Sequence, residues 1–186
     1  MAHGKKNGKM AEQFLTLMAD LDDDAQALLS GWYSTLRIHG FTGSQTPGLP
    51  YHISLASYSP EREREIAELA EKAAGMFSAF PVHISHMGIF SGGKVLFAAP
   101  ERNAELNALR EACEKKPDEE YPWTPHITML IDEPDTICAA LPELIRSFRP
   151  FTARVTRLHL CAFRPTRGIL SVALAGGRQI PFDREP

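Results

Sequence analysis

The chain has 186 residues, of which 44% are hydrophobic and 23% are charged, and this is the composition of an ordinary globular protein. Twenty basic residues stand against 23 acidic residues, so the formal net charge is only −3. Proteins that bind a long nucleic-acid duplex gain affinity from many lysine and arginine contacts to phosphate. The composition therefore favours a small or terminal substrate over a long duplex.

Cysteine use and hydropathy indicate a reducing, cytoplasmic setting. The three cysteines, Cys113, Cys138 and Cys161, show no CxxC spacing, which argues against a disulfide framework or a zinc site. The chain contains no run of eighteen apolar residues, so we expect no membrane-spanning helix and no membrane partner. Residues 1–9 are polar and glycine-rich and are expected to be a disordered or artificial tail, with a single domain over residues 10–186.

An apolar run and a set of helix-capping residues indicate the first elements. Residues 13–21 are predicted to form a buried strand. The aspartates at positions 22–24 suit a helix start, where carboxylates cap unpaired N–H groups and complement the helix dipole. Apolar residues at helical spacing extend this helix to about Ile38, and Gly40 ends it before a surface loop over residues 41–50.

The other elements follow from apolar periodicity and from the positions of glycine and proline. Two hairpins are expected, one around Ser91-Gly92-Gly93 and one around residues 164–168. Pro142 is expected to kink or restart the last helix. The predicted strands are residues 51–58, 81–90, 94–99, 123–131, 151–163 and 169–175, and the predicted helices are residues 59–77, 103–115 and 135–148.

The order of these elements repeats along the chain. Residues of about 48–100 and of about 122–175 each give a strand with a histidine, then a helix, then a hairpin. The spacing that carries His52 onto His126 also carries the first hairpin turn onto the second. We therefore predict a duplicated α+β fold with antiparallel strands, in which two lobes pack about a pseudo-twofold axis.

A histidine followed two positions later by serine or threonine occurs three times, and the pattern is short enough to arise by chance. Two copies share a context: a loop with proline, then the histidine early in a strand, isoleucine next, and a helix after the strand. The copy at residues 83–85 instead lies in a strand that feeds a hairpin, and we expect it to be a surface coincidence. The three pairs are His52/Ser54, His83/Ser85 and His126/Thr128.

Two histidines that face each other suit acid–base attack on phosphorus. One imidazole can accept a proton while the other donates one, because histidine titrates near neutral pH. We expect His126 to activate water and His52 to protonate the leaving ribose oxygen. Strand side chains alternate, so Ser54 and Thr128 share a face with the histidines and can donate hydrogen bonds to non-bridging phosphate oxygens. This chemistry requires no metal or other cofactor. The alternative is that both histidines are core or strand-edge residues without a catalytic role.

The sequences H-I-S-L at residues 52–55 and H-I-T-M at residues 126–129 resemble the paired motifs of the two-histidine (2H) phosphoesterase superfamily. In those motifs a histidine is followed at the second position by threonine or serine and then by a hydrophobic residue. The superfamily includes the 2′-5′ RNA ligase-like proteins and the cyclic phosphodiesterases, and the resemblance extends over about residues 13–175. It implies a bilobal fold in which antiparallel sheets line a central cleft, with helices outside.

The resemblance also implies an activity, the metal-independent opening of 2′,3′-cyclic phosphates on RNA 3′ ends or small cyclic nucleotides. His52 and His126 would be catalytic, and Ser54 and Thr128 would bind the phosphate. Some members also join RNA ends through 2′-5′ linkages in the reverse direction. Two departures are visible: serine replaces the commoner threonine in the first motif, and Ile-Asp-Glu at residues 131–133 stands where several ligase-like members carry a basic residue. A non-catalytic module that binds nucleotides or RNA ends is the alternative function.

Four further residues are candidates for substrate contact. Tyr51 and Trp123 flank the histidines and can stack on a base, or can serve as packing residues at strand edges. Arg164 and Arg167 lie at the tip of the second hairpin and can contact phosphate, or can be solvated turn residues. The sequence does not indicate an oligomeric state.

Overall fold

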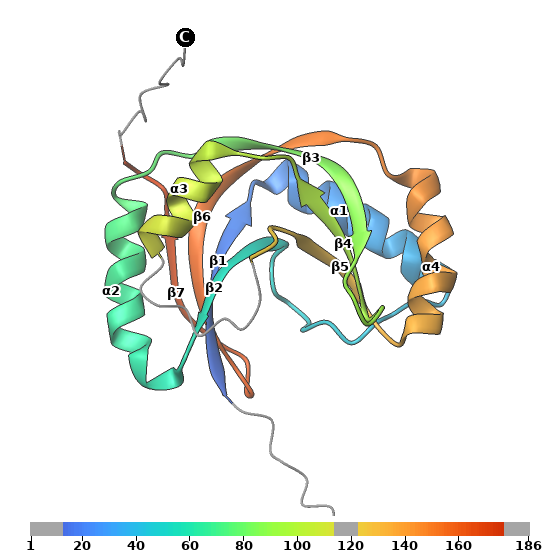
Figure 1. Ribbon diagram of the computed structural model, residues 1–186, viewed down its shortest axis with the longest axis horizontal. Helices are drawn as coiled ribbons and strands as arrows, with labels where there is room; N and C mark the ends of the chain where they lie inside the picture. Colours follow the sequence, from blue (N-terminus) through green and yellow to red (C-terminus); the bar gives the residue numbers. More distant parts are fainter. Residues whose placement is uncertain (1–12, 114–122, 177–186) are drawn as a thin grey trace, which may run out of the picture.

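The structure, a computed structural model, describes residues 13–113 and 123–176 (Figure 1). Its strands are β1 (Phe14–Leu21), β2 (His52–Tyr58), β3 (Phe80–Ile89), β4 (Val95–Pro100), β5 (Ile127–Ile131), β6 (Phe151–Phe163) and β7 (Arg167–Ala173). Its helices are α1 (Asp23–Ile38), α2 (Glu63–Ala74), α3 (Ala104–Cys113) and α4 (Pro134–Ser147), with a short 3-10 helix, η1 (Pro60–Arg62). The expected tail at residues 1–9 lies outside the described residues.

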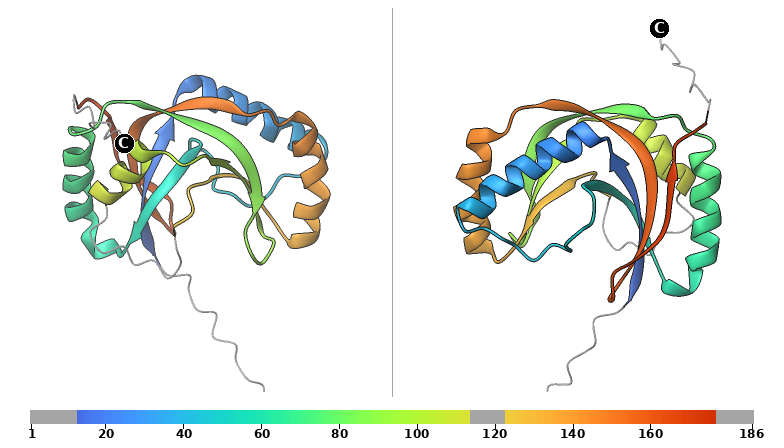
Figure 2. Two further views of the ribbon diagram at one scale, coloured as in Figure 1. Left: turned by 45° about the horizontal axis from the view of Figure 1, so that its top comes forward. Right: turned by 180° about the vertical axis from the view of Figure 1, so that it is seen from behind.

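The seven described strands form one sheet in which every pairing is antiparallel. Six of them follow the order β2-β1-β6-β3-β4-β5, and β7 pairs with β6 off this path. The long strand β6 pairs with β1, and also with β3 near its start and with β7 near its end. The two strands that carry the histidine motifs, β2 and β5, are therefore the two ends of this strand order. Figures 1 and 2 show the sheet as an arch, and β2 and β5 come into contact across its inner side.

The helices lie outside the arch in two groups, one for each lobe. Helix α2 packs with α3 and against β6 and β7, whereas α1 packs with α4 and against β5 and β6. In Figure 1, α2 and α4 stand at opposite ends of the arch. The expected α+β fold with antiparallel strands and outer helices is confirmed. The residue limits of the two repeats stay a prediction.

Strand β1 is buried on both faces, which explains its nearly continuous apolar sequence. One face carries Leu15, Leu17 and Ala19, which belong to the main hydrophobic core. The other face carries Met18 and Asp20, which are also buried but lie outside that core. Because side chains alternate along a strand, the Met18 and Asp20 side chains point to the inside of the arch. Strands β2 and β6 are the neighbours of β1 on its two sides.

Most element positions agree with the sequence prediction, and two details differ. The carboxylate of Asp22 accepts a hydrogen bond from the Ala25 N–H (3.0 Å), which confirms the predicted helix cap. His126 directly precedes β5 instead of lying inside the strand. Pro142 does not restart a helix, because α4 continues through it to Ser147. Buried apolar residues on both sides of the proline, including Leu144, hold the helix against the core in spite of the lost N–H donor.

Candidate active site

The two motif histidines hold equivalent positions at the end strands of the sheet. His52 is the first residue of β2, and His126 is the residue before β5. Both side chains are partly buried, and the two strands are in contact. The structure thus brings together the two halves of the site that the sequence places far apart.

Both imidazoles carry the same hydrogen bond to the main chain. Nδ1 of His52 lies 2.8 Å from the carbonyl oxygen of Pro50, and Nδ1 of His126 lies 2.8 Å from the carbonyl oxygen of Thr124. A carbonyl oxygen only accepts, so each Nδ1 must carry the proton. In the neutral ring Nε2 then has the lone pair, and it is the atom that can take up or return a proton. The bond also fixes the orientation of each ring.

Burial lowers the pKa of both histidines, because the charged imidazolium loses water contact. At His52 the bond to Pro50 and the negative charge of Asp20 act in the opposite direction, whereas His126 and His159 lower its pKa further. At His126 the opposing cause is the bond to Thr124. A positive charge on His126 is among the causes that lower the pKa of His52, so a protonated His126 disfavours protonation of His52.

The two rings have different neighbours. The ring of His126 packs edge-on against Phe90, with centroids 4.7 Å apart, and against Phe97, with centroids 5.6 Å apart. His52 instead stands directly opposite Asp20 in the pairing of β2 with β1. His126 therefore packs against two aromatic rings, whereas His52 lies beside a carboxylate.

The hydroxyl residues sit two positions beyond each histidine, as the motif requires. Thr128 stands opposite Phe97 in the pairing of β5 with β4, on the same face as His126. Ser54 is half-buried on β2, and its carbonyl oxygen accepts a hydrogen bond from Nε1 of Trp123 (2.8 Å). This bond ties the segment before β5 directly to β2.

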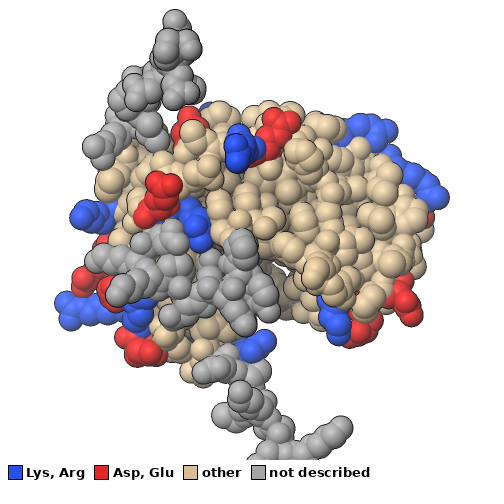
Figure 3. Space-filling view, viewed as in Figure 1, with Lys and Arg blue, Asp and Glu red and all other residues tan. Residues whose placement is uncertain are grey.

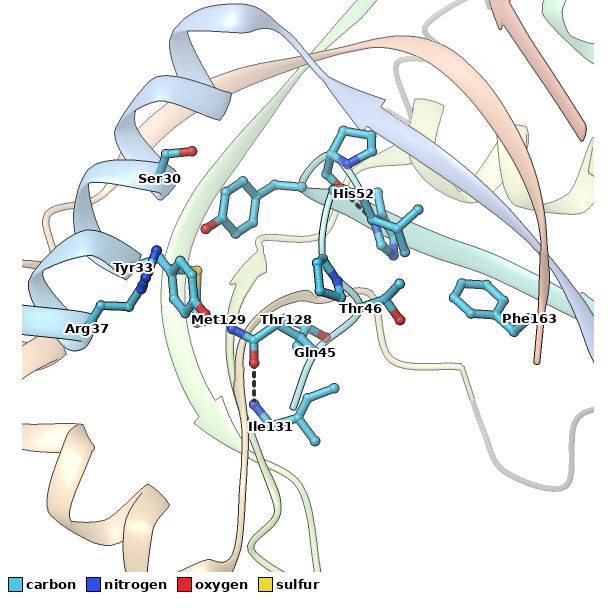
Figure 4. A pocket seen from close by; sticks show the side chains of 15 residues that line it. Ser30, Tyr33, Arg37, Gln45, Thr46, His52, Thr128, Met129, Ile131 and Phe163 are labelled. Atoms are coloured by element: carbon cyan, nitrogen blue, oxygen red, sulfur yellow. Dashed lines mark hydrogen bonds between the residues drawn. The ribbon is translucent and has the colours of Figure 1, made fainter. Parts of the chain in front are cut away.

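A cavity of about 560 Å³ opens beside the histidine motifs (Figure 4). This volume is within the range of small-molecule sites. Helix α1 supplies one wall, the loop over residues 45–50 supplies another, the motif strands supply a third, and Phe163 at the end of β6 also lines the cavity. Residues from these three sources include Tyr33 and Arg37 on α1, Gln45 in the loop, and His52 and Thr128 on the strands.

Tyr51 lines this cavity next to His52. Its main chain is held by Gln26, which accepts from the Tyr51 N–H (2.8 Å) and donates to the Tyr51 carbonyl oxygen (2.7 Å). Burial and the neighbouring Tyr33 raise the pKa of Tyr51 to about 12, so its phenol stays neutral at any physiological pH. An aromatic ring in this place can pack against a nucleobase.

The other candidate contacts are placed differently. The indole of Trp123 is engaged by Ser54 and is covered by the guanidinium of Arg110, whose Cζ lies 4.8 Å from the ring centre. Arg164 lies over the ring of Phe14 and lines a second cavity that does not include the histidines. Arg167 pairs with Glu63 on α2. The structure thus groups Tyr51 with His52 and Thr128 at the cavity, and gives Trp123 a packing contact with Arg110 and β2.

The excluded pair at residues 83–85 is placed as predicted. His83 is exposed on β3, where Nδ1 lies 3.2 Å from the hydroxyl of Thr152 on β6. The sequence did not predict two other residue sets: Phe90 and Phe97 beside His126, and the buried Asp20 with the partly buried His159 beside His52. Their sequence neighbours do not indicate these contacts, because each depends on which strands pair.

The described residues, 13–113 and 123–176, contain no group of three or more His, Cys, Asp or Glu side chains that could hold a metal ion. Within the same ranges no helix has the length and apolar character needed to span a membrane.

Comparisons with known proteins identify the family and the fold of the chain. Residues 21–165 match the sequence model of the 2′-5′ RNA ligase superfamily, whereas no match is found among curated protein sequences. Among solved structures, LigT of E. coli complexed with ATP is 21% identical, with 88% of this chain and 99% of that chain covered and a TM-score of 0.60. TT0787 of Thermus thermophilus is 17% identical, with 89% and 100% covered and a TM-score of 0.61. The chain belongs to the 2′-5′ RNA ligase superfamily of two-histidine phosphoesterases.

Proposed function

We propose that this protein is a metal-independent phosphodiesterase that opens 2′,3′-cyclic phosphates, at RNA ends or on nucleotides, by acid–base catalysis with two histidines. The observation that carries the proposal is the matched hydrogen bonding of His52 and His126. Each ring is held by a carbonyl oxygen through Nδ1, so each offers Nε2 for proton transfer. Two such rings on contacting strands can serve the two sides of one phosphorus atom.

The reaction can be written with these groups alone. Nε2 of His126 accepts a proton from water as the water oxygen bonds to phosphorus. The bond from phosphorus to the ribose 3′ oxygen breaks, and Nε2 of His52 gives its proton to that oxygen, which leaves a 2′-phosphate. The hydroxyls of Ser54 and Thr128 donate to the non-bridging oxygens as negative charge develops there. With the 5′ hydroxyl of a second RNA as the nucleophile in place of water, the same breaking of the bond from phosphorus to the 3′ oxygen would join the two ends through a 2′-5′ linkage.

The cavity beside the motifs supports a nucleotide-sized substrate. It reaches from His52 and Thr128 to Tyr33 on α1, and Tyr51 adds a second aromatic side chain. Solved structures of LigT, which shares the fold, hold ATP, 3′-AMP and NADP+. A base between the tyrosines would place the attached ribose phosphate near the histidines.

Surface charge also supports a small or terminal substrate. On the one face that Figure 3 draws, Lys and Arg are interspersed with Asp and Glu and form no continuous basic band. Near the second motif, the Lys94 ammonium pairs with Glu133 (2.8 Å), so the local charges largely balance. Affinity for a long duplex requires many unpaired basic side chains along one face.

Single replacement of each histidine by alanine tests the proposal. Turnover of 2′,3′-cyclic mononucleotides and of RNA oligonucleotides with a cyclic phosphate end should fall by about a thousandfold or more in both variants. His83→Ala is the matched control, because His83 belongs to the same sequence pattern but is exposed on β3. Persistent turnover in both motif variants would refute the assignment. Tight nucleotide binding by a wild-type protein without turnover would instead establish the binding module.

A further inference from the structure

A buried carboxylate stands beside one of the two motif histidines. Asp20 on β1 is only 6% exposed. It is the direct partner of His52 in the antiparallel pairing of β1 with β2, and side chains of directly opposed residues share a face with Cβ atoms about 5 Å apart. The carboxylate therefore lies within reach of the His52 ring.

A second histidine holds the other side of this carboxylate. Nδ1 of His159, on β6, lies 3.4 Å from Oδ2 of Asp20. Nε2 of the same ring lies 3.3 Å from Sγ of Cys161. Burial and the nearby Asp20 raise the pKa of the Cys161 thiol, so the sulfur stays protonated and can donate to Nε2. With the thiol as donor, the proton of the neutral ring would lie on Nδ1, towards Asp20.

The carboxylate is not neutralised by a closer partner. Among the described residues, Oδ1 of Asp20 and Nδ1 of His159 are buried without a hydrogen bond of ordinary geometry. Arg157 stands opposite Asp20 on β6, but it is exposed and donates to the hydroxyl of Ser171 on β7. A buried negative charge with incomplete pairing acts strongly on a neighbouring imidazole, because little water screens it.

We propose that Asp20 is a positioning residue that makes the two motif histidines chemically different, holding His52 as the proton donor of the reaction. His159 lies on the other side of the Asp20 carboxylate, and Cys161 contacts the His159 ring. His126, which lies against Phe90 and Phe97, serves as the proton acceptor. The inference rests on the proposed two-histidine function and assigns the direction of proton transfer within it.

The charges that face His52 act in both directions. Asp20 on β1 raises the pKa of His52, whereas burial, His126 near β5 and His159 on β6 lower it. For His126 the causes of the pKa shift are burial and the carbonyl oxygen of Thr124, and no carboxylate is among them.

The test is Asp20→Asn, which keeps the shape of the side chain and removes its charge. If His52 is the acid, the alkaline limb of the pH profile of kcat/KM reports its deprotonation. Loss of the carboxylate should move this limb to lower pH by about one unit and leave the acidic limb in place. Asp24→Asn, an exposed carboxylate on the first turn of α1, is the matched control and should keep the wild-type profile.

A nuclear magnetic resonance titration of the histidine rings gives a readout that does not depend on turnover. In Asp20→Asn the pKa of His52 should fall by about one unit, while that of His126 should change little. A uniform loss of rate with both limbs and both ring titrations unmoved would show a merely structural role and overturn the inference. Such a result would leave the proposed function intact, provided that the His52→Ala and His126→Ala variants are inactive. An inactive wild type with a shifted His52 titration would refute the function and retain the electrostatic link.

Discussion

The indole N–H of Trp123 donates to the carbonyl oxygen of Ser54 at 2.8 Å, and this bond joins the segment before His126 to the strand of His52. Trp123 is only three residues before His126, and Ser54 is two residues after His52. A single hydrogen bond therefore connects the two motifs. The relative placement of the acid and the base contributes much of the rate enhancement in such a site, because small misplacements reduce the reaction rate steeply.

Trp123→Phe should reduce turnover through this bond. Phenylalanine keeps an aromatic face for Arg110 but leaves the Ser54 carbonyl without its donor. We expect a loss of about 1 kcal/mol in the free energy of unfolding, and a fall in kcat of roughly tenfold to a hundredfold. Urea denaturation and steady-state kinetics measure the two effects. Trp32→Phe, in the core against Phe148, should lower stability without a comparable loss of kcat; equal effects on kcat would contradict the prediction.

The hydroxyls of the two motifs should act in the transition state more than in substrate binding. Thr128→Val keeps the shape of the side chain and removes its donor, and we expect kcat to fall by about a hundredfold with KM changed little. Thr128→Ser keeps the donor and should stay within a few fold of the wild type. Ser54→Ala and Ser54→Thr form the same pair for the first motif. Equal rates in the Val and Ser variants of Thr128 would show that its hydroxyl does not contact the phosphate.

The fold and the histidine pair could be predicted because their signals are local. Apolar periodicity and helix caps set the elements, as Asp22 shows, and the duplicated context separated His52 and His126 from His83. Helix caps and apolar periodicity depend on residues within a few positions of one another. The duplicated context is recognised by comparing two such local patterns. Neighbouring residues in the sequence are sufficient to specify them.

The environment of each histidine could not be predicted, because it depends on which distant strands pair. Asp20 lies in an apolar run and just before three more aspartates, so its sequence gives no sign that it is buried beside His52. His159 joins it only because β6 pairs with β1. Likewise Phe97 reaches His126 through the pairing of β4 with β5. Strand pairing of this kind is settled by packing of the whole sheet.

Acid should destabilise the protein through the buried histidines. Their pKa values are lowered in the folded state, so the unfolded chain, with an ordinary histidine value of about 6.5, binds more protons just below that pH. The free energy of unfolding should therefore be highest above pH 6.5 and fall as the pH drops through the window between 6.5 and the lowered values. Urea denaturation at pH 7.5 and pH 5.5 measures the loss. The double variant His52→Asn/His126→Asn should lose roughly 1 kcal/mol less than the wild type over this range.

An exposed histidine provides the control for this pH dependence. His83→Asn, on the surface of β3, should keep the wild-type difference between the two pH values. If the double variant also keeps the wild-type difference, the acid sensitivity comes from other groups. The pKa values of the motif histidines would then not be lowered in the folded protein.

Gly88→Ala should disturb the packing of His126 indirectly, through the ring of Phe97. Gly88 on β3 stands opposite Phe97 on β4, and a Cβ at this position would lie 2.8 Å from Cε2 of the Phe97 ring, with Cζ closer still. The ring must move, and it packs against the ring of His126. We expect a loss of about 1–3 kcal/mol in the free energy of unfolding, with a fall in kcat of at least tenfold. Gly31→Ala in α1, where a Cβ meets no atom within 4 Å, should instead stabilise by up to about 1 kcal/mol. Unchanged kcat in a destabilised Gly88→Ala protein would show that the position of Phe97 does not govern that of His126.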